Sequence, residues 1–272
     1  MKLVKEDGNI YYENDGIIIG KVTFSKIDKN TYNINHTFVD EKYRGKGIAS
    51  KLVEEAFKYI KDKGCNVTAS CSYAKDWLEK NKTVVFASNN KHKIVEVKDI
   101  LKDYNVLSLN DIGFKDDIIE DGKTIEENSL IKAKAVHEYL KNKKLNYIVL
   151  ADDTGLCINS LNGEPGVLSA RYAGDHDDQK NRNKVLEKLK GKDRSAYFKC
   201  VITVMYTDGT YKSFEGITEG KITEKEIGDT SFGYDAIFYS NDLNKTFGEA
   251  TSDEKNSVSH RGRALKNMLK NM

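Results

Sequence analysis

Along the first 80 residues the hydrophobic pattern changes from alternation to a helical period and back. Strands are predicted at 10–12, 16–24 (GIIIGKVTF), 31–39 (TYNINHTFV) and 66–70, with Asn14-Asp15-Gly16 as the first turn. Residues 46–63 predict an amphipathic helix, whose apolar stripe is Ile48, Leu52, Val53, Ala56, Phe57 and Ile60. A short helix is expected at 73–80. These elements predict a small unit of mixed sheet and helices.

The pattern restarts near Lys82 and predicts a second, larger unit. Strands are predicted at 83–87 (TVVFA) and, short and central, at 147–151 (YIVLA), with a hairpin of 196–206 and 210–217 around Thr207-Asp208-Gly209. Helices are predicted at 91–103, 124–143, 177–190 and within 252–271, the last with Ala264, Leu265, Met268 and Leu269 facing inward. Thr124 and Glu127 form a capping box. The fold class is therefore α/β or α+β in two domains, 1–81 and 82–272.

Composition excludes several classes of protein. With 15 Tyr, 10 Phe and interspersed charges that sum to +2, the chain is neither disordered nor marked by a basic patch for nucleic acid. No segment has the apolar length of a membrane span, and the N-terminus lacks the apolar core of a signal peptide. None of the four cysteines forms a CxxC pair, so reduced thiols in a cytoplasmic protein are expected.

A glycine-bearing turn precedes the 46–63 helix, in the sequence YRGKGIAS (43–50). Gly45 and Gly47 remove side chains where the backbone turns, so the N–H groups at the helix start could hold a pyrophosphate, with added charge from Arg44. A solvated turn with a basic cap is the alternative, and short glycine motifs favour it when taken alone.

The surrounding residues carry a resemblance. The stretch HTFVDEKYRGKGIASKLVEEAFKYIKDKG, followed by Cys71, resembles minimal GNAT-type N-acetyltransferase domains over residues 1–80, and Arg44, Gly47 and Ala49 match that family's Arg-x-x-Gly-x-Ala loop. The resemblance implies acetyl-CoA against strand 31–39, with its pyrophosphate on Arg44, Gly45, Lys46, Gly47, Ile48 and Ala49. It implies no acceptor. Cys71 is a nucleophile, a pocket residue or a small packing residue, and His36 a base or a structural histidine.

In the second unit, the sequence SNNKHKIVE (88–96) follows a strand and opens a helix. The Ser88 hydroxyl, the Asn90 amide and free N–H groups could bind phosphate, and Lys93 in the first turn could reach the same anion. Lys93 and Glu96 are three residues apart and are predicted to pair. Taken alone, the segment is better explained as an ordinary Ser/Asn helix cap.

Adjacent acids come directly after the predicted strand 147–151. Asp152 and Asp153 at the carboxyl end of a buried strand are costly without a cation, and they point opposite ways, one to a site and one to brace the loop. Thr154 and Gly155 are read as a turn. An Asx turn is the alternative. Glu127 is the further candidate acid, and magnesium needs only one or two carboxylates beside substrate phosphates.

Together with further motifs in the same order, these segments resemble the inosine/xanthosine triphosphate pyrophosphatases over residues 83–272. The further motifs are Gly166 with SARYAG (169–174), residues 178–181, FGYD (232–235), Lys255 and Ser259-His260-Arg261. The resemblance implies a two-lobed mixed sheet flanked by helices, a homodimer, and hydrolysis of ITP, dITP or XTP to the monophosphate and pyrophosphate. Asn89, Ser231 and Ala236 depart from the family's usual glycine, glycine and proline.

The resemblance also assigns roles. It places the triphosphate on Ser88, Asn89, Asn90, Lys91, His92 and Lys93, and magnesium on Glu127 and Asp153 with Asp152 beside them. Asp153 also accepts a proton from water, and Thr154 touches substrate. The purine lies on Phe232, Gly233, Tyr234 and Asp235, and its 6-oxo edge is read by Lys255, Ser259, His260 and Arg261. Two alternatives stay open: acetyl transfer as the main activity, or an N-terminal domain that is a non-catalytic acetyl-CoA sensor or scaffold.

Overall fold

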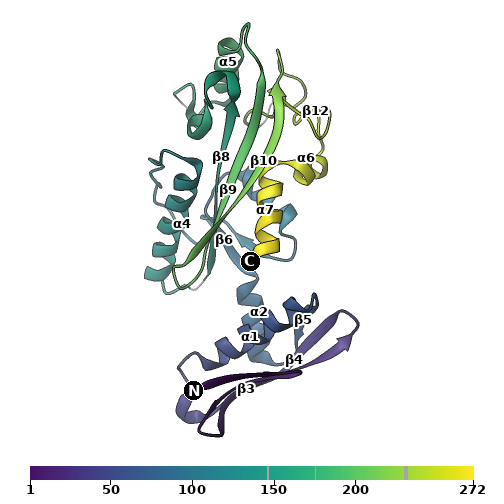
Figure 1. The fold of residues 1–272 in the computed structure, drawn as a ribbon. Helices are drawn as coiled ribbons and strands as arrows, with labels where there is room; N and C mark the ends of the chain where they lie inside the picture. The colour runs from purple at the N-terminus through teal and green to yellow at the C-terminus, as the bar shows by residue number, and fades with distance from the viewer. Residues whose placement is uncertain (146, 175, 230–231) are drawn as a thin grey trace. The chain divides into compact units, whose positions relative to one another are not determined.

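The computed structural model describes residues 1–145, 147–174, 176–229 and 232–272. Contacts divide the chain into two compact units, Met1–Lys82 and Thr83–Met272, each with its own sheet (Figure 1). The predicted class, mixed α/β in two sheets, is confirmed. No described helix has the length and apolar character needed to cross a membrane, and all four cysteines are free thiols.

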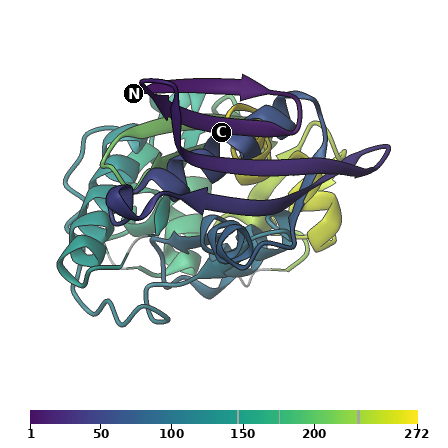
Figure 2. The same cartoon turned by 90° about the horizontal axis from the view of Figure 1, so that it is seen from below.

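The first unit is a five-stranded sheet covered by two helices. Its strands, in spatial order, are β1 (Lys2–Glu6), β2 (Asn9–Asn14), β3 (Ile17–Asp28), β4 (Thr31–Val39) and β5 (Asn66–Ala69), seen side by side in Figure 2. Only the β4–β5 pair is parallel. The two covering helices are α1 (Ile48–Asp62) and α2 (Ser72–Asn81), and a short 3-10 turn, η1 (Glu41–Tyr43), precedes α1. The predicted stripe of α1, apart from the half-buried Phe57, packs on Ile10, Val22 and Ile34, as its period requires.

The second unit is built on a seven-stranded mixed sheet in the order β12-β11-β10-β9-β8-β6-β7. The strands are β6 (Thr83–Phe86), β7 (Asn105–Leu107), β8 (Ile148–Ile158), β9 (Ser195–Met205), β10 (Tyr211–Ile222), β11 (Phe238–Ser240) and β12 (Lys245–Thr246). The helices are α3 (Lys91–Ile100), α4 (Ile125–Asn142), η2 (Asn159–Leu161), η3 (Gly166–Arg171), α5 (Asp178–Lys188), η4 (Asp235–Ile237), α6 (Ser252–Val258) and α7 (His260–Asn271).

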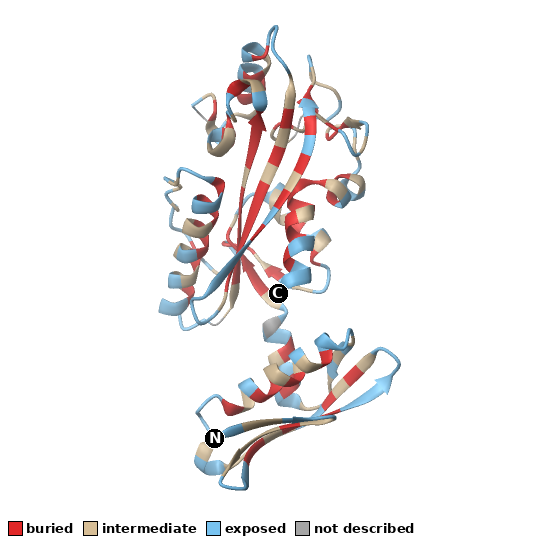
Figure 3. Cartoon of the chain, in the orientation of Figure 1, coloured by how far each residue is buried: buried red, intermediate tan, exposed pale blue. Residues whose placement is uncertain are grey.

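Alternation along β8 assigns its two faces to different helices. Leu150 belongs to the buried cluster that includes residues of α3 and α7, whereas its neighbours Val149 and Ala151 belong to the cluster of α4. Because successive side chains of a strand point to opposite faces, α4 covers one face of the sheet and α3 with α7 the other. Figure 3 shows the resulting band of buried residues along β8 and β9.

The extent of β8 corrects a prediction. The strand does not end at residue 151; it continues through Asp152, Asp153, Thr154 and Gly155, all paired with β9. The acids are therefore inside the strand, and Thr154-Gly155 is not a turn. The ladder and the compensating cations outweigh the poor strand propensity of Asp and Gly. Gly155 marks a close approach instead, since a Cβ there would lie 2.7 Å from the Gly166 carbonyl oxygen.

The C-terminal segment also differs from the single helix expected. Ser259 has extended backbone (φ −65°, ψ 156°) and separates α6 from α7. Ala264, Leu265 and Met268 are buried as predicted, but Leu269 is 41% exposed, so its assignment to the inner face was wrong. β1 was not predicted, because its five residues are half-exposed or exposed and carry no hydrophobic alternation.

Candidate active site

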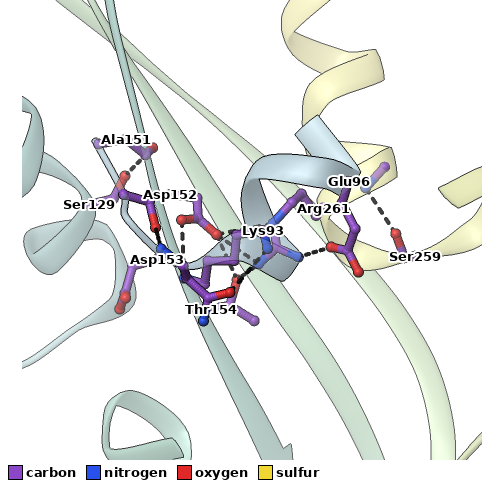
Figure 4. A network of polar contacts seen from close by, with 12 residues as sticks. Lys93, Glu96, Ser129, Ala151, Asp152, Asp153, Thr154, Ser259 and Arg261 are labelled. Atoms are coloured by element: carbon purple, nitrogen blue, oxygen red, sulfur yellow. Dashed lines mark hydrogen bonds and ion pairs between the residues drawn. The ribbon is translucent and has the colours of Figure 1, made fainter. Parts of the chain in front are cut away.

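Asp152 lies on the α3–α7 face of β8, where two cations meet it (Figure 4). Its Oδ1 atom is 3.1 Å from Lys93 Nζ of α3, and its Oδ2 atom accepts from Arg261 Nη2 of α7 at 2.8 Å. The residue is 1% exposed. Burial disfavours the charged form, but Lys93 and Arg261 outweigh it and hold the pKa of Asp152 below its ordinary value. Asp152 is thus a fully compensated brace between the two helices.

Asp153, the next residue, faces α4 instead. Its Oδ1 atom is 2.8 Å from the Nζ atom of Lys132, and the same ammonium is 2.6 Å from Glu120 Oε2. Burial raises the pKa of Asp153, although Lys132 opposes the rise. A carboxylate with a raised pKa is a better proton acceptor than an ordinary aspartate. Two carboxylates that are not neighbours in sequence thus converge on one positive charge.

Glu127 lies on the same helix as Lys132, but its carboxylate is used locally. The Oε2 atom accepts from the backbone N–H groups of Lys123 at 2.6 Å and Thr124 at 3.1 Å. The predicted capping box is confirmed, and it employs one of the two carboxylate oxygens of the residue that the resemblance assigned to magnesium. The carboxylate that the structure brings to Lys132 beside Asp153 is that of Glu120.

Sequence reasoning missed Glu120 and Lys132. A signal for Lys132 exists, because it falls on the helical stripe of buried Ile125, Val136 and Leu140. A lysine on a buried stripe needs a partner, since an unpaired buried charge is costly. Nothing in the sequence around Glu120 identifies it, because its contact with Lys132 is set by the course of the loop before α4.

The segment Ser88–Lys93 forms the start of α3. Ser88 Oγ accepts from Asn90 N at 3.1 Å, Asn90 Oδ1 caps Lys93 N at 3.2 Å, and Asn89 Oδ1 accepts from Asn110 N at 3.0 Å. Lys91 is exposed. Lys93 pairs with Asp152, so the predicted pair with Glu96 is not formed. Asn89, where the family has glycine, thus fastens the turn to the following loop.

Glu96 is the centre of a chain of alternating charges. It pairs with Arg261 on one side and with Lys255 Nζ at 2.8 Å on the other, and Lys255 pairs with Asp235 at 2.5 Å. Burial opposes its ionisation, but Arg261 and Lys255 outweigh this and lower the pKa of Glu96 to about 2. The chain links Asp152 and Lys93 to the segment 232–235.

That segment presents one aromatic ring among polar groups. Phe232 is half-buried, stacks on His92 at a centroid distance of 4.9 Å, and has Lys255 Nζ 5.0 Å from its ring centre. Tyr234 is buried and donates to the Ser169 carbonyl at 2.7 Å, so it belongs to the core. His92, assigned to the triphosphate, therefore lies against the aromatic residue. Ala236 is buried, and Ser231 lies outside the described residues.

Ser259, His260 and Arg261 are all buried at the start of α7. The Ser259 hydroxyl accepts from Gly262 N at 3.1 Å and caps the helix, and Arg261 is occupied by Asp152 and Glu96. The His260 ring stacks on Phe198 at 4.6 Å, and its Nδ1 atom has no partner among the described residues. Burial lowers the pKa of His260 well below 6.5.

The neutral His260 gives a pH prediction. Below pH 6.5 the unfolded chain protonates this residue and the folded chain does not, so stability falls as pH is lowered, by about 1.4 kcal/mol per pH unit at most. His260→Phe keeps the stacking and should flatten the profile between pH 6.5 and 5, measured by calorimetric unfolding of the second unit. Parallel profiles for the two proteins would contradict this. Glu96 titrates at far lower pH and does not interfere.

In the first unit, the predicted anion-binding turn has the required backbone. Gly45 and Gly47 have φ of 77° and 73°, and Gly47 is the N-cap of α1, which therefore begins without a side-chain cap. β5 pairs with β4 only from Thr31 to Ile34, and within the described chain no strand follows along this edge to Val39. Cys71 lies beside this edge, with Sγ 3.6 Å from Thr37 Oγ1. Burial opposes its ionisation, but hydrogen bonds from Ala74 and Thr37 outweigh this and lower the pKa of Cys71.

The chain was compared with known proteins. Residues 84–271 match the model of the Ham1 family, and residues 9–86 match that of the GCN5-related N-acetyl-transferases. A dITP/XTP pyrophosphatase of Clostridium perfringens is 49% identical over 198 residues, which are 70% of this chain and 97% of the relative. One from Bacillus subtilis is 47% identical over 195 residues, 70% of this chain and 96% of the relative.

Solved structures agree with these relatives. The Ham1 protein of Staphylococcus aureus is 40% identical with a TM-score of 0.61, and covers 69% of this chain and 96% of its own. The structure of a Coxiella burnetii HAM1 protein is 38% identical with the same TM-score of 0.61, over 69% and 96% of the two chains. Through its second unit, this chain belongs to the Ham1 family.

Proposed function

We propose that the second unit hydrolyses non-standard purine nucleoside triphosphates (ITP, dITP and XTP) to the monophosphate and pyrophosphate. The observation that carries the proposal is the pair Asp153 and Glu120 around a single ammonium, with Asp152, the neighbour of Asp153 in β8, paired to Lys93 at the start of α3. The carboxylates are suited to bind a metal ion and to accept a proton, and the N–H groups at the start of α3 are suited to bind phosphate. The names of the relatives support the same substrate class.

Magnesium fits these residues. No three His, Cys, Asp or Glu side chains in the described parts of the chain are grouped to hold a metal ion alone. Magnesium does not need such a group, because it takes one or two carboxylates with substrate phosphates and water. Asp153 and Glu120, which already share one cation, are the donors we propose. Bound there, magnesium would neutralise the phosphate oxygens.

The remaining chemistry comes from the chain itself. Asp153 accepts a proton from water as the water oxygen bonds to the α-phosphorus, and the bond from the α-phosphorus to the bridging oxygen breaks, so that pyrophosphate leaves with that oxygen. Lys93 and the N–H groups of α3 hold the charged phosphates. Positioning and electrostatic stabilisation supply most of the rate, as in other phosphoryl transfers.

The base is held at the other end of the charge chain. Phe232 offers a stacking face, and the donor Lys255 Nζ lies 5.0 Å from the centre of its ring. A 6-oxo group accepts from a lysine, whereas the 6-amino group of adenine is itself a donor and is rejected. Arg261 and Ser259 act on this surface only indirectly, because their polar atoms are buried and engaged within the fold, and His260 is buried with its ring against Phe198.

A nucleotide panel tests the proposal. Pyrophosphate release is measured with magnesium from ITP, dITP, XTP, ATP and GTP. We expect the first three to be hydrolysed far faster than ATP. Release at the same rate from all five, or only phosphate release, would rule out the proposed function.

Glu120 and Glu127 are alternative magnesium ligands, and substituting each in turn distinguishes the two assignments. Glu120→Gln should lower kcat by about 10²-fold or more and raise the magnesium concentration needed, because one of two carboxylates is lost. Glu127→Gln keeps the capping box, because a glutamine oxygen accepts the same N–H groups, and should leave helix stability and kcat close to those of the parent. Magnesium titrations of both variants measure this. The reverse order of effects would favour Glu127 as the ligand.

For the first unit we propose acetyl-CoA binding as a second function. The support is the uncapped N-terminus of α1 behind Gly45 and Gly47, together with the unpaired β4 edge beside Cys71. Titration calorimetry of the full chain with acetyl-CoA should show binding, and Gly47→Val should abolish it, since φ of 73° strains a β-branched residue. No heat with the parent chain would leave the scaffold alternative; binding without acetyl transfer to amines would favour the sensor.

The homodimer and the cytoplasmic location stay predictions. Light scattering of the full chain would test the first.

A further inference from the structure

We infer that Asp178 and Arg182 of α5 are positioning residues that hold the peptide of Gly233, and thereby the ring of Phe232, ready for the purine. The inference rests on the proposed function and extends it to α5. None of the residues assigned to the purine base belongs to this helix. Asp178 and Arg182 are four residues apart, so they lie on one side of the helix.

The two side chains bind opposite ends of Gly233. The Asp178 Oδ2 atom accepts from Gly233 N at 2.7 Å, and Arg182 Nη1 donates to the Gly233 carbonyl at 2.7 Å. Gly233 has φ of 52°, in the left-handed region, so this residue has wide conformational freedom unless something holds it. The two hydrogen bonds fix the backbone immediately after Phe232.

Arg182 is itself held rigidly. It is 2% exposed, its Nε atom donates to Glu226 at 2.6 Å, and its Nη2 atom donates to Gln179 at 2.9 Å. Gln179 also donates to Glu226 at 2.7 Å. Both Arg182 contacts use the planar fork of the guanidinium, which loses little further freedom when it binds the carbonyl of Gly233.

α5 is a firm base for this contact. Val185 of α5 packs in the same buried cluster as Tyr234, the residue that follows Gly233 in the sequence. Asn181 accepts from Ala173 N at 2.7 Å and donates to the Ala170 carbonyl at 3.2 Å. A binding surface held before the ligand arrives avoids part of the ordering cost of binding. The clamp should therefore act on affinity for the base and little on the chemical step.

The test uses the full chain and Asp178, because Arg182 is buried and its loss would disturb the fold more widely. Asp178→Ala removes the acceptor for Gly233 N, and Asp178→Asn keeps a carbonyl acceptor without charge. Glu187→Ala, on the same helix and in an exposed pair with Lys190 beyond its end, is the matched control. Steady-state kinetics with dITP are combined with calorimetry using IMP, which has the base, and tripolyphosphate, which does not.

For Asp178→Ala we expect KM for dITP and the Kd of IMP to rise about tenfold, kcat to change less than about threefold, and tripolyphosphate binding to stay as it was. Asp178→Asn and Glu187→Ala should resemble the parent. Equal losses for IMP and tripolyphosphate, unchanged KM, or no rescue by asparagine would overturn the inference. A parent chain that binds IMP but releases no pyrophosphate from dITP would refute the proposed function alone, and calorimetry would still decide the clamp. Absence of IMP binding to the parent would refute both.

Discussion

Asp153→Asn is expected to lower kcat for dITP by about 10²- to 10⁴-fold and to leave the fold intact, because it removes the proposed proton acceptor without changing the shape of the side chain. Burial already raises the pKa of Asp153, so loss of its charge costs the folded state little, and Lys132 keeps Glu120 as a partner. Pyrophosphate release and calorimetric unfolding measure the two effects.

The neighbouring residue supplies the control. Asp152→Asn changes an identical group one position along β8, but it leaves Lys93 and Arg261 with less counter-charge on the buried face. We expect this variant to unfold at lower temperature. A stable, fully active Asp153→Asn enzyme would refute the role of Asp153, and equal destabilisation by both substitutions would refute the division of labour between the two faces.

Glu96→Gln is expected to lower the free energy of unfolding of the second unit by about 3 kcal/mol, the lower end for a broken buried pair, because a small part of its side chain is exposed. For a unit of this size that corresponds to a fall in Tm of roughly 6 to 12 °C. The reason is that Arg261 and Lys255 share this one carboxylate. Scanning calorimetry of the full chain measures the transition.

Glu126→Gln is the matched control for that experiment. Glu126 pairs with Lys199 at 2.7 Å, but its side chain is 48% exposed, so its loss should cost under about 1 kcal/mol. Glu96→Gln should also weaken selection of dITP over dATP, because Lys255 then has only Asp235 to orient it. A Tm shift no larger than that of Glu126→Gln would mean that Glu96 is not the centre of the charge chain.

Elements with a complete local signal could be predicted from the sequence. The stripe of α1, the capping box of Thr124 and Glu127, and the β9–β10 hairpin around Thr207-Asp208-Gly209 each depend on residues within a few positions of one another. The end of β8 could not be predicted in the same way, because its acids are tolerated only through Lys93, Lys132 and Arg261, which come from three other elements.

The same distinction applies to the site. The motifs around Lys93, Asp153 and Lys255 were found by sequence, yet their partners were not. Glu96 was predicted to pair within its own helix, where i,i+3 spacing allows it, but it pairs with Arg261, 165 residues away. Such contacts depend on how the sheet brings α3 and α7 together, and no local pattern records that.

The alternation of β8 has a consequence for insertions and deletions. Asp152 and Asp153 differ in role only because the pleat sends one to each side of the sheet, and loss of a single residue from β8 ahead of them would exchange their directions. Every amino acid of the proposed reaction would still be present, but the brace and the proposed proton acceptor would face opposite sides of the sheet from before. The activity of this protein is therefore expected to depend on the number of residues in β8 as well as on their identity.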